Sequence, residues 1–403
     1  PDSDIQSVFL TCRLTSINSR LEQTNFSVIP SDATRGLRIL CTEPHVGSLE
    51  PAGFSSLNLL EDLVIEGCAL ESLPSDAFQG LVSLKRLTVS TRNLSVLKLQ
   101  SDSFSHLSSL ERLDLSENSI REFPAGEICS LAHLRHLNLS SNQIGAVSDL
   151  DRGCLPSLEL LDLSSNEMTS LETNSLPASL RELRVQRNFI RFIAPDVFHS
   201  NSSISELDMS NNQINHLPAP LLHSVSLRSL NLANNTLSSL PRDVLHGQKQ
   251  LETLDLSGNL LASAELSPEL TRDMFSLMEL DLSGNIIQEV SKEFLSTFPN
   301  LQVLRLKFNK IAAMQMSPSL FQLKELELSG NKLEKMAADN LEGLESLTHL
   351  SLGNNQIQTI HPATFRNASQ LLVLDISDNQ LTEIPDSPKY LHNLQTLDIG
   401  GNL

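Results

Sequence analysis

The sequence predicts an α/β-type solenoid, in which short parallel strands stack side by side and irregular loops return the chain between them. Two observations carry this prediction. A nine-residue frame, L-x-x-L-x-L-x-x-N, stands at Leu371–Asn379 and recurs along the chain. Its copies follow one another every 22 to 26 residues, mostly every 24. That period accommodates a strand, a turn and an irregular return path, but it is too short for a full helix.

Each part of the frame has a structural meaning. Leu374 and Ile376 are two residues apart, so they point to the same side of a short strand. Asn379 ends the strand, and its amide can bond backbone groups of its own loop and of the neighbouring repeat. Thirteen frames hold this asparagine in one register: Asn118, Asn142, Asn166, Asn188, Asn212, Asn235, Asn259, Asn285, Asn309, Asn331, Asn355, Asn379 and Asn402.

This frame is the signature of a leucine-rich repeat. The fold class is therefore an α/β-type leucine-rich-repeat solenoid. We expect a curved arc with a parallel β-sheet on the concave face, and loops with short 3-10 or helical turns on the convex face. Many return loops carry a phenylalanine six residues before the first leucine, and we expect these rings to stack as a second core row: Phe54, Phe78, Phe104, Phe198 and Phe365.

The organisation of the chain follows from where the frame is present. Residues 1–45 lack it and are expected to form a cysteine-bridged N-terminal cap, because the first repeat of a solenoid has a bare core face. Residues 46–403 are expected to form about 15 repeats. The last frame stops at Leu403 without a second cysteine cluster, so we expect a truncated chain that lacks a C-terminal cap.

Composition and charge restrict the class of protein. The chain has 29 basic and 48 acidic residues and a formal net charge of −19. This balance disfavours nucleic acid, whose phosphates need a basic surface, and favours a basic partner. No apolar run of 18 residues is present, so the sequence predicts no membrane-spanning helix, and any membrane contact would come from segments outside this chain.

Cysteines and glycosylation sequons indicate an extracellular protein. Cys12 and Cys41 would close a loop of about 30 residues, worth roughly 3–4 kcal/mol. Cys129 and Cys154 are 25 residues apart, which places them on stacked loops at a separation that a disulfide tolerates. Cys68 occupies an asparagine position and is expected to be a buried, unpaired thiol. Six N-x-S/T sequons occur, at Asn25, Asn93, Asn138, Asn201, Asn234 and Asn367, and together with the cysteines they favour secretion and glycosylation.

No catalytic chemistry is evident in the sequence. The motifs of α/β-hydrolases, zinc proteases, P-loop proteins and dinucleotide-binding proteins are missing, so we predict no enzyme, no cofactor and no metal. Acidic residues fill the middle position of many L-x-L segments, either as common repeat filling or as a cation-binding ladder. His199, His223 and His246 recur at repeat spacing, either as solvated loop residues or as a pH-sensing or metal-binding row.

Two strands interrupt the acidic filling of the predicted concave face. One carries Arg184, Gln186 and Arg187, and the other carries Arg305, Lys307 and Phe308. Elsewhere these positions hold Asp, Asn, Ser or Gly. Arginine and aromatic side chains on an exposed surface are typical protein-binding anchors, and ordinary surface variation is the alternative. A glycan on Asn138, whose side chain is expected on the same face, would push binding to the lateral side or to later repeats.

The chain resembles the N-terminal half of an arthropod Toll receptor ectodomain, most closely the long Toll subgroup. The resemblance rests on Thr24–Pro30 with Cys12 and Cys41, on Leu84–Thr88 with its long following loop, and on Leu110–Ser116. Cys129 and Cys154 also look like cysteines of that family.

The resemblance implies an extracellular ligand-recognition ectodomain of a single-pass type I membrane protein. It implies a protein ligand of the Spätzle cystine-knot type, signalling in innate immunity or development, and receptor dimerisation. A cell-surface adhesion or patterning ectodomain is the first alternative, and a secreted matrix repeat protein is the second.

Overall fold

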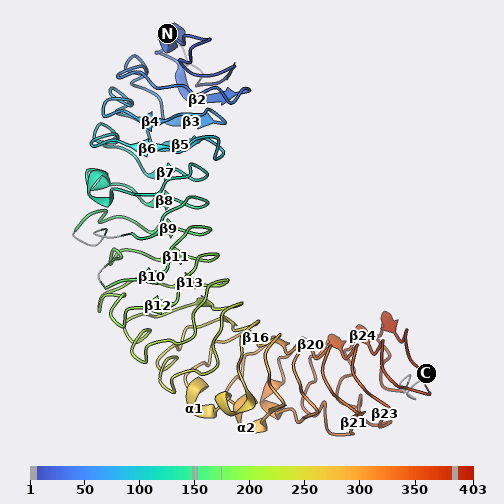
Figure 1. Cartoon of the computed structure of the whole chain (residues 1–403). Helices are drawn as coiled ribbons and strands as arrows, with labels where there is room; N and C mark the ends of the chain where they lie inside the picture. The colour runs from blue at the N-terminus through green and yellow to red at the C-terminus, as the bar shows by residue number, and fades with distance from the viewer. Residues whose placement is uncertain (1–6, 148–149, 151–152, 174, 384–388) are drawn as a thin grey trace, which may run out of the picture. The chain divides into compact units, whose positions relative to one another are not determined.

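The computed structural model describes residues 7–147, 150, 153–173, 175–383 and 389–403. The chain forms two compact units, unit 1 (Pro1–Ile204) and unit 2 (Ser205–Leu403). Within each unit every strand of the main sheet runs parallel to its neighbours, one strand per repeat (Figure 1). The predicted leucine-rich-repeat solenoid is therefore confirmed.

The main sheet of unit 1 begins with two longer strands and continues with shorter ones. Its strands are β1 (Val8–Leu14), β2 (Thr34–Cys41), β3 (Asp62–Glu66), β5 (Arg86–Ser90), β7 (Arg112–Asp114), β8 (His136–Asn138), β9 (Leu160–Asp162) and β11 (Glu182–Arg184). The two strands within the predicted cap belong to the same sheet, because β1 pairs with β2, and β2 pairs with β3.

The main sheet of unit 2 is more regular, with three residues in every strand. Its strands are β13 (Glu206–Asp208), β14 (Ser229–Asn231), β15 (Thr253–Asp255), β16 (Glu279–Asp281), β18 (Val303–Arg305), β20 (Glu325–Glu327), β22 (His349–Ser351), β24 (Val373–Asp375) and β25 (Thr396–Asp398). The leucine of each strand lies opposite the leucine of the next, as in Leu254 and Leu280. This register buries one apolar side chain per repeat in the same row.

The return path of each repeat contains only short elements, as the period requires. Two-residue strands pair with one another: β4 (Ser72–Leu73) with β6 (Lys98–Leu99), β10 (Ser170–Leu171) with β12 (Phe192–Ile193), β17 (Glu289–Val290) with β19 (Ala313–Met314), and β21 (Lys335–Met336) with β23 (Thr359–Ile360). The helical turns are η1 (Phe26–Val28), η2 (Ala125–Ile128), η3 (Ser263–Glu265), α1 (Pro268–Thr271), α2 (Lys292–Leu295) and η4 (Pro318–Leu320). Figure 1 shows α1 and α2 on the side of unit 2 away from β16.

Two apolar rows fill the core. The central strand leucines are buried from β3 to β24, whereas Leu397 in the last strand is 41% exposed, and the predicted phenylalanine row is present beside them. Phe26, Phe54, Phe78 and Phe104 stack in sequence, with ring centroids 4.7, 6.5 and 6.3 Å apart. Phe198 and Phe365 are buried at the equivalent positions.

The asparagines of the frame form a ladder within each unit, buried from Asn118 to Asn379 and half-buried at Asn402. Asn142 is representative: its Nδ2 donates to the carbonyls of Leu115 and Leu139, both at 2.9 Å, and its Oδ1 accepts from the backbone N–H of Ile120 at 3.0 Å. Each amide thus connects its own repeat to the preceding one. Because these groups are buried, the bonds remove polar atoms that would otherwise lack partners.

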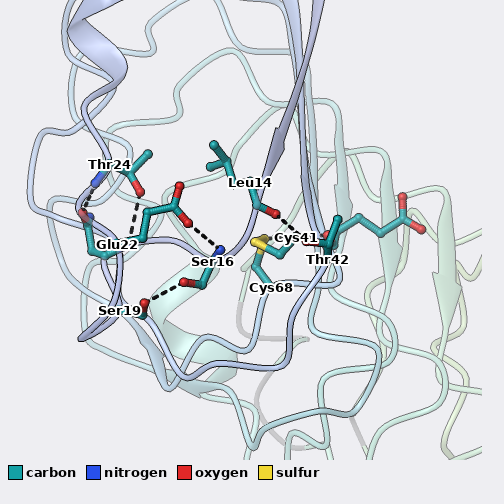
Figure 2. Close-up of a disulfide and its surroundings, with 10 residues drawn as sticks. Leu14, Ser16, Ser19, Glu22, Thr24, Cys41, Thr42 and Cys68 are labelled. Atoms are coloured by element: carbon teal, nitrogen blue, oxygen red, sulfur yellow. Dashed lines mark hydrogen bonds between the residues drawn. A yellow bond between two sulfur atoms is a disulfide. The ribbon is translucent and has the colours of Figure 1, made fainter.

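The first predicted disulfide is wrong. Cys41 bonds Cys68 (Figure 2), with Cα atoms 4.9 Å apart. Cys12 is a free thiol. In the β1–β2 register Cys12 lies opposite Ile39, two residues before Cys41. That offset, added to the strand spacing, separates the Cα atoms of Cys12 and Cys41 by about 8 Å, beyond the roughly 6.8 Å that a disulfide tolerates.

The second predicted disulfide is present. Cys129 bonds Cys154, with Cα atoms 4.5 Å apart. Cys154 and Cys68 are both buried, while Cys12 is half-buried. Two covalent links therefore join neighbouring repeats of unit 1, and the predicted unpaired state of Cys68 is wrong because its thiol is used in the first of them.

Candidate protein-recognition surface

The exposed side of the main sheet, here called the sheet face, carries three columns of side chains. Their positions are given relative to the central leucine of each strand, for example Leu113 in β7. The flank column holds the residue two before it, the first column the residue one before it, and the second column the residue one after it. Glu111, Arg112 and Asp114 are the corresponding residues of this repeat. Neighbours within a column come from adjacent repeats, about 4.8 Å apart.

Aspartates of the second column have a structural role. In each of seven repeats an Asp Oδ1 accepts the backbone N–H two residues further on, at 2.9 or 3.0 Å: Asp114, Asp162, Asp208, Asp255, Asp281, Asp375 and Asp398. This bond closes the turn after the strand, as Asp side chains commonly do. No group of three or more His, Cys, Asp or Glu residues in the described part of the chain has the geometry to hold a metal ion.

The first predicted patch does not present a free cation at Arg184. The guanidinium of Arg184 contacts Glu182 at 2.5 Å and Asp162 at 3.7 Å, so its charge is neutralised within unit 1. The Gln186 Oε1 is buried and accepts no hydrogen bond from any residue that the structure describes. Arg187 is exposed and adopts a left-handed backbone conformation (φ 58°).

The second predicted patch is centred on a cation that is surrounded by acids. This cation is Arg305, and its guanidinium lies among four carboxylates: Glu279, Asp281, Glu325 and Glu327. Burial alone would lower the pKa of Arg305, but these negative charges outweigh it and raise the pKa. Lys307 in turn pairs with Glu327 at 2.7 Å. The sheet face here therefore keeps a net negative charge, and Arg305 has no unsatisfied charge to offer.

Phe308 is the exception on this surface. The residue before each ladder asparagine is left-handed throughout both units, and it is Gly, Asn, Asp, Ser or Glu in every repeat except at Arg187 and Phe308. Phe308 has φ 53° and its side chain is 64% exposed. A left-handed conformation costs a residue with a Cβ roughly 1–2 kcal/mol. Core burial does not offset this cost at Phe308, because most of the ring faces solvent.

The surroundings of Phe308 make room for an exposed ring. In the next repeat Gly330 occupies the same position, and a Cβ there would lie 2.5 Å from the ring of Phe308. In the two preceding repeats Gly284 and Gly258 take that position. Leu260 and Ile286, each directly after a ladder asparagine, are 49% and 39% exposed. We call Leu260, Ile286 and Phe308 the apolar edge of unit 2.

A hollow in the sheet face of unit 1 was not predicted. It has a volume of about 400 Å³ and is lined by first- and second-column residues, including Arg86, Arg112, Asp114, His136 and Asn138. Alignment of the repeats on their central leucines would have placed Arg86, Arg112 and His136 in one column. The signal lies across three strands and not within any one of them, because each strand contributes a single residue to the column.

The predicted glycosylation sequons differ in exposure. Asn25, Asn93, Asn201 and Asn234 are exposed, and Asn367 is half-buried. Asn138 is half-buried inside the hollow, where its Nδ2 donates to Asp114 Oδ2 at 3.1 Å and its Oδ1 accepts the Ser140 N–H at 3.0 Å. A glycan on that nitrogen would occupy the hollow.

Two of the histidines at repeat spacing, His223 and His246, contact groups on neighbouring return loops. The ring Nε2 of His223 lies 3.2 Å from the carbonyl oxygen of Asp243, and that of His246 lies 3.4 Å from a carboxylate oxygen of Asp273. No helix in the described part of the chain is long and apolar enough to cross a membrane.

The fold and the buried asparagine ladder define a solenoid of leucine-rich repeats with a polar sheet face. The family model "Leucine rich repeat" matches residues 91–144, 178–235, 218–261, 275–333, 299–357, 321–371 and 345–403. The chain therefore belongs to the leucine-rich repeat family.

Among curated proteins, the chain is 30% identical to mouse Podocan-like protein 1 over 409 residues, covering 94% of this chain and 68% of the relative. It is 34% identical to Drosophila melanogaster Toll-like receptor 7 over 121 residues, which is 28% of this chain and only 8% of that receptor.

Solved structures show the same fold at lower identity. The glycosylated Toll–Spatzle complex of Drosophila contains a chain with TM-score 0.77 and 20% identity, covering 94% of this chain and 54% of that chain. The plant peptide hormone receptor RGFR1 in complex with RGF2 has TM-score 0.52 and 20% identity. The chain thus spans about half the length of the solved structure in the Toll–Spatzle complex.

Proposed function

We propose that this chain is the ligand-recognition part of an extracellular receptor of the Toll type, and that unit 2 contacts a protein ligand through its apolar edge. The observation that carries the proposal is Phe308, a mostly exposed phenylalanine in a backbone conformation that penalises it. Residues held in such conformations without a packing benefit are concentrated at functional sites. Exposed aromatic side chains are also enriched among the residues that dominate protein interfaces.

The charge around the apolar edge favours a basic partner. Four carboxylates surround Arg305, and Lys307 is already paired with Glu327. The whole chain carries a formal net charge of −19. A ligand with a basic surface would be attracted over a distance and oriented before contact. Arg184 and Arg305 then serve to position neighbouring carboxylates, while Phe308 makes the direct contact.

Within this proposal, the ligand is a cystine-knot cytokine of the Spätzle type. Support comes from the likeness of the fold to the solved Toll–Spatzle complex over 94% of this chain and from local identity to a fly Toll-like receptor. The two disulfides and the exposed sequons fit an extracellular location on the plasma membrane. Anchoring by a single membrane span, dimerisation, and signalling in immunity or development belong to the same proposal.

A secreted matrix repeat protein is the second candidate. The observation that favours it is the 30% identity to mouse Podocan-like protein 1, which extends over 94% of this chain and is much longer than the match to the fly receptor. A cell-surface adhesion ectodomain is the remaining alternative. Both would use the same sheet face and apolar edge, but with an immobile partner instead of a soluble ligand.

The test compares binding by the secreted chain and by Phe308→Asn, using a Spätzle-type cytokine and surface plasmon resonance. Asparagine is the residue that other repeats place at this position, so the variant keeps the backbone conformation. We expect the free energy of binding to weaken by at least about 1 kcal/mol, roughly fivefold in Kd, without loss of thermal stability. The matched control is Phe275→Ser, which removes a similarly exposed phenylalanine (51%) from a return loop and should leave binding unchanged.

Equal affinity of the chain and Phe308→Asn would refute the role of the apolar edge. No binding of the cytokine by the unmodified chain, together with binding to cell surfaces or to extracellular matrix, would favour the adhesion or the matrix candidate.

A further inference from the structure

The flank column of unit 1 shows how this fold arranges charge between neighbouring repeats. Its residues alternate in sign over seven repeats: Arg35, Glu61, Lys85, Glu111, Arg135, Glu159 and Arg181. Each is adjacent to the next, because the backbone N–H of one donates to the carbonyl of the one before, as from Glu111 to Lys85. Two of the contacts close into ion pairs at 3.0 Å, Lys85 with Glu61 and Arg135 with Glu159. Opposite charges directly across adjacent strands stabilise a sheet.

The first column, which lies one residue further along each strand than the flank column, does not alternate in charge. Arg86 lies directly opposite Arg112, and Arg112 lies directly opposite His136. Like charges in such register destabilise a sheet. Arg86 is neutralised by Asp62 at 2.9 Å. Arg112 is exposed and forms no ion pair with any residue that the structure describes. In a chain with 48 acidic residues against 29 basic ones, a cation that lies opposite another arginine without an ion pair of its own needs an explanation outside the fold.

The hollow of unit 1 supplies this explanation, because Arg112 and His136 both line it. Its volume of about 400 Å³ accommodates a side chain and not a folded element. The same hollow is lined by the carboxylates of Asp62, Asp114 and Asp162. These acids would repel an extended polyanion, whereas a single carboxylate flanked by neutral or basic groups could reach Arg112. Arginine also matches a carboxylate geometrically through two parallel hydrogen bonds.

We propose that this hollow is a carboxylate-binding subsite, which takes one Asp or Glu side chain of a polypeptide partner onto Arg112, with His136 beside it. The subsite lies in unit 1 and does not depend on the function proposed for the apolar edge of unit 2. Protonation of His136 adds a positive charge next to the bound carboxylate, so the affinity rises as the pH falls.

The groups around His136 determine where this pH response occurs. Burial and the charge of Arg112 lower the pKa of His136, and Arg135 lowers it further, whereas Glu159 and Glu182 act in the opposite direction. His136 is therefore mostly neutral at pH 7. A carboxylate bound to Arg112 cancels part of the unfavourable charge, so saturation of the subsite raises the pKa of His136.

The experiment follows the His136 ring by NMR in the 403-residue chain labelled with ¹³C-histidine. All variants carry Ser140→Ala, which removes the sequon of Asn138 and keeps a glycan out of the hollow. The probe is a blocked Gly-Glu-Gly peptide at low ionic strength. We expect a saturable shift of the His136 signal and a rise of its pKa on saturation. Arg112→Gln should weaken the apparent affinity by about tenfold or more, the usual loss for a charge-assisted contact. Lys85→Gln, in the alternating flank column, should retain the saturable shift.

A second variant separates binding from folding. Arg112→Glu restores the alternation of charge next to Arg86, so we expect a melting temperature equal to or above that of the unmodified chain together with loss of probe binding. A structural role for Arg112 would instead lower the melting temperature. The proposal is overturned if the unmodified chain shows no saturable shift, or if Arg112→Gln binds the probe as well as the unmodified chain. It is also overturned if a heparin octasaccharide shifts His136 at micromolar concentration while the Glu peptide does not, because the ligand would then be a sulfated polysaccharide.

Discussion

Replacement of Asn259 by Ala tests whether the asparagine ladder stabilises the solenoid through its hydrogen bonds. Asn259 Nδ2 donates to the carbonyls of Leu232 (3.0 Å), Leu256 (3.0 Å) and Ser257 (3.1 Å), and its Oδ1 accepts the Leu237 N–H at 3.0 Å. Removal of the amide does not affect the four partners equally. The expected loss in the free energy of unfolding depends on which partners keep another hydrogen bond.

The three carbonyls keep other donors. Leu232 O also accepts from Asn235, Leu256 O from Asn285, and Ser257 O from the Asn234 N–H. The Leu237 N–H is buried and has no other acceptor among the described residues. An orphaned buried donor costs about 1–3 kcal/mol, and each weakened carbonyl adds a smaller amount. We therefore expect Asn259→Ala to lower the free energy of unfolding by about 3 kcal/mol.

Urea denaturation monitored by circular dichroism measures the loss, and hydrogen exchange of the Leu237 amide localises it. Asn259→Asp is a sharper variant, because it keeps the acceptor for Leu237 but directs a carboxylate oxygen at three carbonyls. It should destabilise more than Ala at neutral pH. The control is Asn215→Ala, which removes an exposed asparagine whose side chain forms no hydrogen bond with any residue that the structure describes, and it should change stability by less than about 0.5 kcal/mol. A loss below about 1 kcal/mol for Asn259→Ala, with Leu237 exchange unchanged, would refute the reasoning.

Three further predictions follow from single contacts. Maleimide should label Cys12 in the native chain without reductant, and non-reducing peptide mapping should recover Cys41 linked to Cys68; a Cys12–Cys41 peptide would contradict the structure. Burial, together with the charges of neighbouring second-column aspartates, raises the pKa of Asp255 above its usual 3.8. The native carboxyl therefore binds its proton more tightly than the unfolded one, and stability is lost as the pH rises from 3.8 through the folded-state pKa. Because Asp255→Asn creates an N-x-S sequon with Ser257, the variant is produced without glycosylation. It should then raise the melting temperature at pH 7 and have little effect below pH 3.8. Mass spectrometry of secreted material should find glycans at exposed sequons such as Asn201.

The sequence alone determined the repeat architecture. The frame recurs in a constant internal order, so the positions of Leu374, Ile376 and Asn379 within it are enough to predict the strand, the core and the turn. No contact with a distant part of the chain has to be known. The phenylalanine row followed for the same reason, since Phe54, Phe78 and Phe104 hold a constant offset from their leucines.

What only the tertiary structure decided concerns contacts between repeats. Cys41 pairs with Cys68 because an offset of two residues between β1 and β2 places Cys12 out of reach. Arg184 and Arg305 are neutralised by acids that lie 2 to 26 residues away in the sequence, which their isolated strands did not reveal. The conformation of Phe308 is likewise set by the turn before Asn309, and not by its own preference. These properties depend on which side chains meet across strands, and because repeat length varies from 22 to 26 residues, only the packed register brings specific pairs together.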